Sequence, residues 1–427
     1  MRNRLSDGER VCIVGGGPAG SFAAMHLLRE ARTRSLDLEV LIFEPRDFSR
    51  PGPVGCNRCA GILSDSLLNG LAELELELPR DVIQADIDSY RIHIDGVQIK
   101  IDKPGESRHL VSVYRGGGPR MISNEVEGFD AFLLSQARQA GATIVPRRVH
   151  TISPGDRPML HTIESEIPAD LVILATGVNS RSPLDRAFGY RPPQNATMAQ
   201  DEFMRPEAWP EKTVHAYFNQ PAGLIFGALI PKGRYVNVSL LGEDMSISAV
   251  GEFLEAHQLS ERLGSDYRSL CGCTPKIAVR ASRRYYGPRW VAVGDAAVTR
   301  LYKDGIGSAF ATARAAVRSA LEHGVSAQSF RQGYRPYCRE VIVDNRYGRV
   351  LFSSWQRALQ YPTFRRTLLR ILRAEEHEPP EKRIYSRILW GMLSGGETYR
   401  DLFRLSLNPR AMRTIVKGWL SAQRELR

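Results

Sequence analysis

The sequence has 427 residues, of which 43% are hydrophobic and 25% are charged, and its formal net charge is +11. This composition is typical of a globular protein and excludes a disordered or fibrous chain, and the length suffices for two or three domains. No stretch approaches the roughly 20 apolar residues of a membrane-spanning helix, and the polar N-terminus lacks the apolar segment of a secretory signal. Because six cysteines in a chain of this length do not form a disulfide scaffold, we expect a cytoplasmic protein.

The first predicted strand, residues 11–14, leads directly into a G-x-G-x-x-G motif. Gly15 would make the tight turn, and Gly17, which has no Cβ, would let a pyrophosphate approach the backbone. Gly20 would let the next helix pack closely on the sheet. That helix, predicted from residue 19 to about residue 29, would point its free N–H groups at the phosphate. The motif predicts a dinucleotide site.

A second predicted strand, residues 38–43, ends at Glu44, which lies 24 residues beyond Gly20. An acid at about this place in a dinucleotide-binding unit binds the ribose hydroxyls. The alternative is a glycine-rich turn that binds nothing. The order of strand, motif, helix and acid favours the binding site.

A loop rich in proline and glycine follows at residues 50–62 and contains Cys56 and Cys59 in a C-x-x-C arrangement. Long loops of this kind are often functional. The two cysteines are interpreted either as a redox pair beside a cofactor or as small residues packed in a loop. A zinc site shared with Cys271 and Cys273 is disfavoured, because C-x-C is poor spacing for zinc. We therefore predict no metal.

The middle of the chain alternates between strands and helices. Residues 90–94 and 97–101 flank an Asp95-Gly96 turn and predict a hairpin. A helix is predicted over 129–140. The apolar run 171–174 predicts a buried strand that leads to Ala175, Thr176 and Gly177, at the edge of the sheet where nucleotides bind.

A second unit is predicted between about residues 190 and 285. Three consecutive strand candidates, 213–219, 224–230 and 235–241, favour an antiparallel sheet. The chain then returns to the first domain with a strand at 290–293 that ends in Gly294 and Asp295. An alanine-rich helix is predicted to follow, with Gly305 and Gly307 near its N-terminus.

The predicted fold class is α/β. Residues 1–190 and 286–330 would form a discontinuous Rossmann-type domain, with 80–120 contributing strands to a second domain. Residues 191–285 would form that second domain, an inserted antiparallel-sheet substrate domain. Residues 331–427 would form a basic, helical C-terminal region.

The C-terminal region, 331–427, holds 20 Lys and Arg but 9 Asp and Glu, so it carries the whole net charge of the chain. Its basic residues alternate with leucine, isoleucine, tryptophan and phenylalanine at helical spacing. This pattern favours an amphipathic surface that faces anionic lipid or an acidic partner. A solvated basic face on a helical domain remains the alternative. Nucleic acid is not expected as a partner, because no recognition motif is present.

Three of these features together resemble the FAD-dependent oxidoreductases of the para-hydroxybenzoate hydroxylase fold. The first motif with Glu44 resembles the adenosine site. Residues 175–180 resemble an Ala-Asp-Gly-x-x-Ser turn, with Thr176 in place of the aspartate. Gly294 and Asp295, followed by residues 304–307, resemble the second FAD fingerprint, in which the aspartate contacts ribityl and pyrophosphate oxygens.

Within this group the chain looks most like the geranylgeranyl reductases. The similarity rests on the Cys-Ala-Gly-Ile sequence at 59–62 and on residues 223–233. The latter resemble an aromatic-x-Trp-x-Phe-Pro-Lys-Gly strand, but Gly227 stands where tryptophan is expected. The Trp-x-Trp-x-Ile-Pro stretch of flavin halogenases is also absent.

The resemblance implies FAD as cofactor and a set of residues that contact it. These are Gly15, Gly17, Pro18, Ala19, Gly20, Glu44, Pro45, Arg46, Cys59, Ala60, Gly61, Ala175, Thr176, Gly177, Gly294, Asp295, Gly305, Ile306 and Gly307. Catalytic candidates rest on loop placement only, and they are Cys56, Cys59, Lys303 and Asp304.

The resemblance also implies an activity, the reduction of carbon-carbon double bonds in an apolar, prenyl-type substrate by hydride transfer from flavin N5. The alternative is a flavin monooxygenase or halogenase-like enzyme that acts on a small aromatic compound or natural product. A flavin-binding protein without chemistry also stays open. The electron donor is either NAD(P)H or ferredoxin. The expected partners are an apolar small molecule and an anionic membrane surface, where the protein would bind peripherally.

Overall fold

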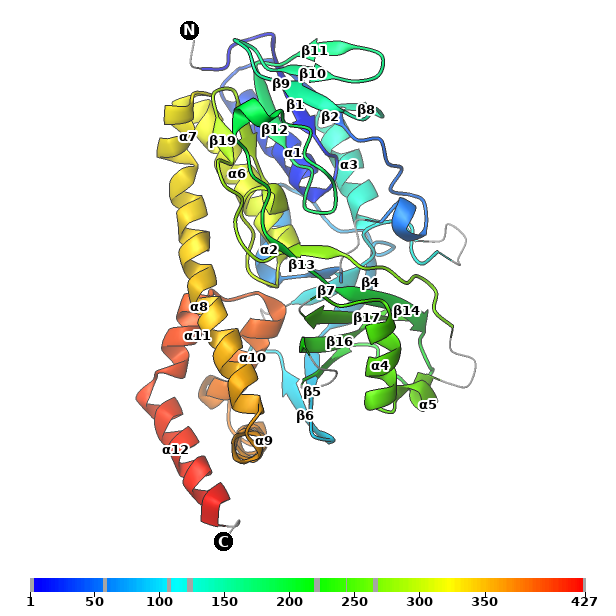
Figure 1. The fold of residues 1–427 in the computed structure, drawn as a ribbon, viewed down its shortest axis with the longest axis vertical. Coiled ribbons are helices and arrows are strands. Elements are labelled where there is room, and N and C mark those ends of the chain that lie inside the picture. Colours follow the sequence, from blue (N-terminus) through cyan, green and yellow to red (C-terminus); the bar gives the residue numbers. More distant parts are fainter. Residues whose placement is uncertain are drawn as a thin grey trace.

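The computed structural model describes residues 4–56, 60–105, 109–120, 126–218, 223–242, 244–263 and 268–424. Figure 1 shows a first sheet with its helices near the N-terminus, a second sheet below it, and C-terminal helices that run beside both. The fold class is therefore the predicted one, an α/β domain joined to a second sheet and a helical C-terminal region.

The first sheet has the order β19-β20-β12-β1-β2-β8, and all its strand pairs except β19-β20 are parallel. Its central strands are buried because residues such as Val11–Val14 and Leu171–Leu174 are apolar without interruption. The strands are β1 (Glu9–Val14), β2 (Leu38–Phe43), β8 (Thr143–Val145), β12 (Leu171–Leu174), β19 (Tyr286–Gly287) and β20 (Trp290–Ala292).

Three helices pack on this sheet: α1 (Pro18–Thr33), α3 (Phe129–Gln139) and α6 (Gly305–His323). α1 is longer than predicted, and it packs closely against α6. Gly20 lets the first turn of α1 lie close to β1 and its turn, since a Cβ there would lie 1.8 Å from the carbonyl oxygen of Gly15. These helices place their N-termini at the same edge of the sheet, next to the carboxyl ends of β1 and β20.

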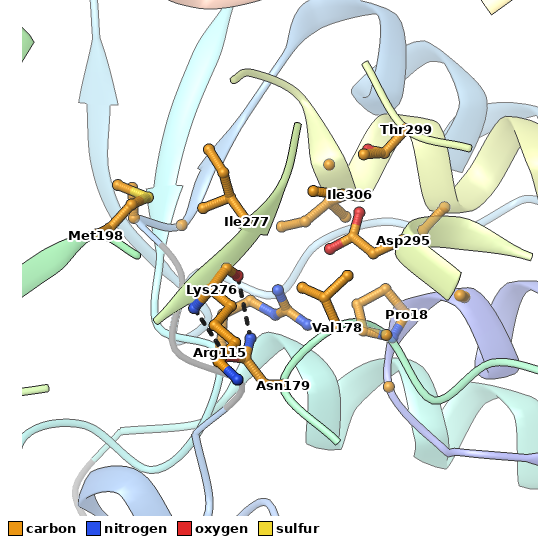
Figure 2. A pocket seen from close by; sticks show the side chains of 18 of the residues that line it. Pro18, Arg115, Val178, Asn179, Met198, Lys276, Ile277, Asp295, Thr299 and Ile306 are labelled. Atoms are coloured by element: carbon orange, nitrogen blue, oxygen red, sulfur yellow. Dashed lines mark hydrogen bonds between the residues drawn. The ribbon is translucent and has the colours of Figure 1, made fainter. Parts of the chain in front are cut away.

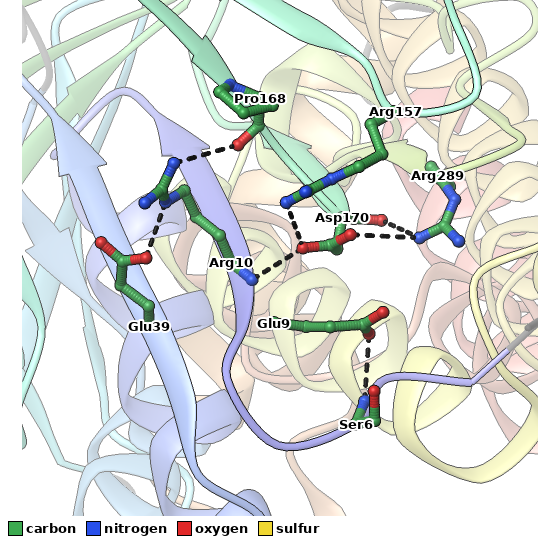
Figure 3. Close-up of polar contacts among 8 residues, drawn as sticks. All are labelled: Ser6, Glu9, Arg10, Glu39, Arg157, Pro168, Asp170 and Arg289. Carbon is green, nitrogen blue, oxygen red and sulfur yellow. Dashed lines mark hydrogen bonds and ion pairs between the residues drawn. The ribbon is translucent and has the colours of Figure 1, made fainter.

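A small antiparallel sheet lies beyond the N-terminal edge of the first sheet, and it consists of β9 (Thr151–Ser153), β10 (Met159–His161) and β11 (Glu166–Pro168). The buried carboxylate of Asp170 ties it to the first sheet, as Figure 3 shows. Asp170 Oδ2 accepts hydrogen bonds from Arg10 N at 3.0 Å and from Arg157 Nη2 at 2.6 Å. Asp170 Oδ1 lies 3.7 Å from Arg289 Nη1. One side chain thus joins β1, β12 and the segment before β20.

The second sheet has the order β14-β17-β16-β15-β5-β6. The predicted hairpin at 90–101 and the three predicted strands all belong to it, but β15 pairs with β5 in parallel, which the sequence did not reveal. One face is covered by α4 (Ser248–Ala256) and α5 (Leu259–Leu263). The strands are β5 (Ser89–Ile94), β6 (Val97–Asp102), β14 (Ala199–Met204), β15 (Thr213–Tyr217), β16 (Leu224–Lys232) and β17 (Tyr235–Gly242).

Short elements connect the two sheets. They are η1 (Gly52–Val54), β3 (Ile62–Leu63), α2 (Asp65–Glu73), β4 (Ile83–Ile87), β7 (Leu110–Val113), η2 (Arg186–Phe188), β13 (Asn195–Thr197), β18 (Lys276–Ala278) and η3 (Gly294–Ala296). β3, β7 and β4 form a three-stranded sheet, and β13 pairs with β18.

α7 and the start of α8 pack into the core of the first sheet, and the later C-terminal helices share a hydrophobic core with the second sheet. Trp390 packs edge-on against Tyr90 of β5, with ring centroids 5.0 Å apart. Within the described part of the chain no helix combines the length and apolarity needed to cross a membrane. The helices are α7 (Ala327–Gly333), α8 (Arg335–Leu359), α9 (Pro362–Glu376), η4 (Pro380–Lys382), α10 (Ile384–Ser394), α11 (Tyr399–Ser406) and α12 (Pro409–Arg424).

Candidate functional site

A cavity of about 550 Å³ lies between the two sheets. One part is formed by the carboxyl ends of β1, β2 and β12, which is where open α/β sheets bind nucleotides. The other part is formed by the face of the second sheet and by the end of α10. Figure 2 shows Pro18, Asp295 and Ile306 in one region of this cavity and Met198 and Ile277 in another.

The N-termini of α1 and α6 both line this cavity. α1 begins after Gly17 without a side-chain cap, and Pro18 and Ala19 of its first turn face the cavity. α6 begins at Gly305, which also lines it. Because helix N-termini present N–H groups and the positive end of the helix dipole, two of them at one cavity form a site for an anion such as a pyrophosphate.

Glu44 lies at the end of β2 and has its carboxylate in the cavity wall. Its Oε2 accepts a hydrogen bond from Gly16 N at 2.9 Å, and its Oε1 accepts one from Arg46 N at 3.0 Å. The side chain is 2% exposed. These bonds hold the Glu44 carboxylate beside the glycine turn, where it could accept a hydrogen bond from a ribose hydroxyl. The helix ends and this carboxylate therefore fit a dinucleotide.

Arg115 is a residue of the cavity wall that the sequence reasoning missed. It forms a two-point ion pair with Asp130 in the first turn of α3: Nη2 lies 2.9 Å from Oδ2, and Nε donates to Oδ1. Both side chains are buried. The guanidinium offers donors to an anionic ligand. The signal was the Phe129-Asp130 pair that opens α3, because a buried acid at that position requires a cation.

Asp295 also lines the cavity, after β20. Burial raises the pKa of Asp295, while the nearby Thr299 hydroxyl and the charge of Arg115 act in the opposite direction. The carboxylate can accept hydrogen bonds from ligand hydroxyls. Its position fits the role that the second fingerprint implied.

The segment 299–304 connects the two regions of the cavity, and C-terminal helices hold it in place. Asn345 of α8 accepts a hydrogen bond from Leu301 N and donates one to Thr299 O, both at 2.8 Å. Tyr399 Oη donates to Leu301 O, and Arg300 donates to the carbonyls of Gly395 and Glu397. The segment thus depends on residues about 40 to 100 positions later in the chain.

Lys303 and Asp304 follow in this segment and line the cavity. The Lys303 ammonium lies 3.9 Å from the centroid of the Phe226 ring. Asp304 has a positive φ of 55° and caps α6, and its Oδ1 also accepts a hydrogen bond from Ser64 Oγ at 3.0 Å. Burial raises the pKa of Asp304 to about 6. A carboxyl of this kind can exchange a proton near neutral pH.

The second region of the cavity is apolar. Its lining residues come from the second sheet, from the β13–β18 pair and from α10, and they include Tyr90, Met198, Val214, Phe226, Ile230, Leu241, Ile277 and Leu393. A wall of this composition suits an apolar molecule.

Most of the residues predicted to contact a cofactor do line the cavity. They are Gly15, Gly17, Pro18, Ala19, Glu44, Pro45, Arg46, Ala60, Gly61, Ala175, Thr176, Gly177, Asp295, Gly305 and Ile306. Cys59 lies outside the described residues.

Three predicted glycines do not line the cavity. Gly20 and Gly294 serve packing, since a Cβ on Gly294 would lie 2.8 Å from the Cβ of Ala19. Gly307 differs from the expectation of a ligand contact, because its N–H already donates to Asp304 Oδ1 at 3.2 Å. All three positions require glycine because a Cβ would collide with neighbouring atoms.

Cys56 does not line the cavity either, which differs from its candidacy as a catalytic residue. It lies close enough to Cys271 for the two thiols to interact electrostatically, and burial raises the pKa of Cys271 to about 11. Both are free cysteines. Among the described residues no three His, Cys, Asp or Glu side chains are grouped as metal ligands.

Comparisons with known proteins agree with this fold. No protein-family model matches the sequence. Protein FixC of Azotobacter vinelandii is 26% identical over 223 residues, which is 45% of this chain and 52% of FixC, so the match spans about half of that relative.

Solved structures match nearly the whole chain. A geranylgeranyl bacteriochlorophyll reductase-like protein from Thermoplasma acidophilum has a TM-score of 0.64 at 17% identity, covering 98% of this chain and 100% of that one. A variant of the halogenase PltM, in complex with FAD, has a TM-score of 0.63 at 14% identity, covering 98% and 97%.

Proposed function

We propose that this chain, which has the fold of the FAD-dependent oxidoreductases of the para-hydroxybenzoate hydroxylase type, binds FAD and reduces carbon-carbon double bonds of an apolar, prenyl-type substrate. The composition of one cavity carries the proposal. Two helix N-termini and a strand-end carboxylate form one region, and an apolar wall forms the other. Such a cavity holds a dinucleotide and brings an apolar molecule next to it.

The residues present fit FAD. The N-termini of α1 and α6 would hold the pyrophosphate, Glu44 would hold the adenosine ribose, and Asp295 would accept from the ribityl hydroxyls. Bound FAD supplies two-electron hydride chemistry, while the protein supplies binding, orientation and the exclusion of water. Arg115, fixed by Asp130, places a positive charge in the same wall.

Reduction of a double bond needs a proton as well as a hydride, and we assign this proton to Asp304. Asp304 lines the cavity, and its raised pKa of about 6 keeps part of the population protonated near neutral pH. Lys303 holds its ammonium over Phe226 on the apolar side. Among the four candidates, Asp304 is preferred to Cys56, because Cys56 does not line the cavity.

The experiment compares two reactions of the purified flavoprotein. The protein is reduced with dithionite without oxygen and mixed with geranylgeraniol, and reoxidation of the flavin is followed by its absorbance. In parallel, reduced protein is mixed with a panel of phenols in air, with and without chloride or bromide. Saturated product in the first reaction supports the proposal, whereas hydroxylated or halogenated phenol in the second supports the alternative. Trials with NADPH and with reduced ferredoxin identify the electron donor.

We also propose an anionic membrane surface as a partner. On α12 and the turn before it, Leu407, Met412 and Val416 are 56%, 46% and 50% exposed. The exposed basic residues Arg410, Arg413 and Lys417 alternate with them along the sequence. Apolar side chains rimmed by cations suit the headgroup region of an anionic bilayer. Because α12 packs on α9, α9 packs on α10, and α10 lines the apolar part of the cavity, the same region would lead a lipid substrate to the site.

A further inference from the structure

A row of polar side chains interrupts the apolar face of the second sheet. On neighbouring strands β14 and β17, Gln200 pairs with Ser239 and Glu202 pairs with Asn237. All four side chains are buried, with relative exposures of 3% for Gln200, Ser239 and Asn237 and 7% for Glu202. Gln200 and Ser239 line the cavity, next to Met198 and Ala228. The row therefore begins at the cavity wall and runs away from it.

The four side chains form a continuous chain of hydrogen bonds. Gln200 Nε2 donates to Ser239 Oγ at 2.9 Å, and Ser239 Oγ donates to Asn237 Oδ1 at 2.6 Å. Asn237 Nδ2 donates to Glu202 Oε1 at 3.3 Å. Every donor points toward the carboxylate, so the chain has one direction.

A buried cation fixes that direction. Lys232, at the end of β16, is 1% exposed and has its Nζ 3.7 Å from Glu202 Oε1 and 4.5 Å from the centroid of the Tyr114 ring. Burial raises the pKa of Glu202, and Lys232 opposes the shift by favouring the ionised form. A carboxylate only accepts hydrogen bonds, so Asn237 must donate its N–H to Glu202 and turn its oxygen toward Ser239.

The direction of this hydrogen-bond chain also determines the orientation of the Gln200 amide at the cavity wall. Ser239 has one proton, and it uses this proton on Asn237, so it must accept from Gln200. Gln200 thereby has one N–H committed, while its other N–H remains for a ligand and its oxygen meets the Cys273 thiol at 4.0 Å. An amide locked in this way is a fixed hydrogen-bonding position in a wall that is otherwise apolar.

We propose that Gln200 and Ser239 bind one hydroxyl group of the substrate, and that Glu202 and Lys232 are positioning residues that hold Gln200 in the required orientation. This inference rests on the proposed function and narrows its substrate class: an apolar molecule that carries a hydroxyl group. A pure hydrocarbon would leave the Gln200 amide unpaired in the cavity wall, which costs binding free energy.

The experiment uses two probes of the same carbon skeleton, geraniol and 2,6-dimethyl-2,6-octadiene, which lacks the hydroxyl. Their dissociation constants are measured by isothermal titration calorimetry on the FAD-loaded protein. Flavin content is recorded separately from the absorbance. A protein that binds no flavin would therefore contradict the proposed function, and not the binding of a hydroxyl group by Gln200 and Ser239. The wild type is expected to bind the alcohol about tenfold more tightly than the hydrocarbon. Equal binding of the two overturns the inference.

Three variants separate recognition from packing. Gln200→Met keeps the length of the side chain. It should weaken the binding of the alcohol alone, so that the alcohol and the hydrocarbon bind with affinities within about twofold of each other. Ser239→Ala is a second test with a smaller change of volume. The control Ile277→Val alters the apolar wall and should weaken both probes by the same factor. If Gln200→Met and Ser239→Ala retain the tenfold preference, the polar row serves the sheet and not the substrate.

The positioning role has its own readout. Glu202→Gln replaces the carboxylate by an amide that can donate as well as accept, so the direction of the hydrogen-bond chain is no longer fixed. The preference for the alcohol should fall although residue 202 does not line the cavity. An unchanged preference in a folded Glu202→Gln protein would remove the positioning role.

Discussion

The backbone N–H of Gly16 donates to the carboxylate of Glu44 at 2.9 Å, across 28 positions of sequence. The bond joins the glycine turn after β1 to the end of β2, and so it fixes the acceptor beside the first turn of α1. Glu44→Ala should lower the affinity for FAD by roughly 1–3 kcal/mol, because ribose hydroxyls lose a charged acceptor and Gly16 loses its partner. Titration of the apoprotein with FAD measures the change. The control is Glu39→Ala on the same strand, since Glu39 is half-exposed and pairs with Arg10; an equal loss in both variants would contradict a specific role.

Gly17 should not tolerate a branched side chain. Its φ of −67° and ψ of −174° are open to any residue, so Gly17→Val leaves the backbone unstrained. A Val side chain at the cavity wall would nevertheless occupy the approach to the N-terminus of α1. We expect a folded protein that is purified without flavin. Gly251→Ala is the matched control, because a Cβ at Gly251 meets no other atom within 4 Å. Full flavin content in Gly17→Val would show that no pyrophosphate binds here.

Asp170 should be important for stability and not for the cofactor. Asp170→Ala removes the carboxylate that accepts from Arg10 N of β1. It also leaves the guanidinium groups of Arg157 and Arg289 without this negative partner. Loss of one partner from a buried ion pair costs about 3–5 kcal/mol, and the exposure of Arg157 places the expected value at the lower end. Urea unfolding measures the loss. Glu166→Ala, an exposed acid of β11, is the comparison and should change stability by less than about 1 kcal/mol.

Asp304 should make stability depend on pH. Burial raises its pKa from 3.8 to about 6, so the folded protein holds this proton more tightly than the unfolded chain does. The contribution to stability is complete below about pH 4 and is lost as pH rises through 6, with a limit of about 3 kcal/mol. When pH rises from 4.5 to 7.5, the free energy of unfolding measured in urea should fall less for Asp304→Asn than for the wild type. Asp81→Asn, at an exposed site, should follow the wild type. Parallel curves for all three proteins would contradict the raised pKa.

The basic residues of α12 should control membrane binding. Changing Arg410, Arg413 and Lys417 to Gln should abolish co-sedimentation with vesicles that contain 30% phosphatidylserine, since each cation near the surface contributes about 1 kcal/mol. The same number of charges is removed outside the C-terminal helices by Arg50→Gln, Arg147→Gln and Arg318→Gln, which are exposed positions, and this control should still bind. Binding of the wild type to neutral vesicles with the same strength would contradict an electrostatic surface.

The sequence predicted the features that depend on local chemistry. Val11–Val14, the glycine turn and Glu44 follow one another closely, so their pattern predicted both strands and the ligand-binding edge. The parallel pairing of β15 with β5 was not predictable, because the two segments are about 120 positions apart. The local pattern of each segment indicates a strand but not its partner. Arg115 was missed because the sequence does not show that Asp130, which lies beyond a glycine-rich stretch, is buried and therefore needs a cation. Cys56 was overestimated, because spacing alone does not say on which side of a loop a thiol lies.

The C-terminal helices hold the segment 299–304 through Asn345 and Tyr399 and share their core with β5 and β6. The cavity is therefore complete only when the chain has been synthesised past residue 399. During translation the parallel sheet, with β20 and α6, can form earlier, but the wall that contains Lys303 and Asp304 must wait for the last hundred residues. For this reason we expect loading of a ligand to be a late event in biogenesis. A prematurely terminated chain would carry the glycine turn and Glu44 without the complete cavity around them.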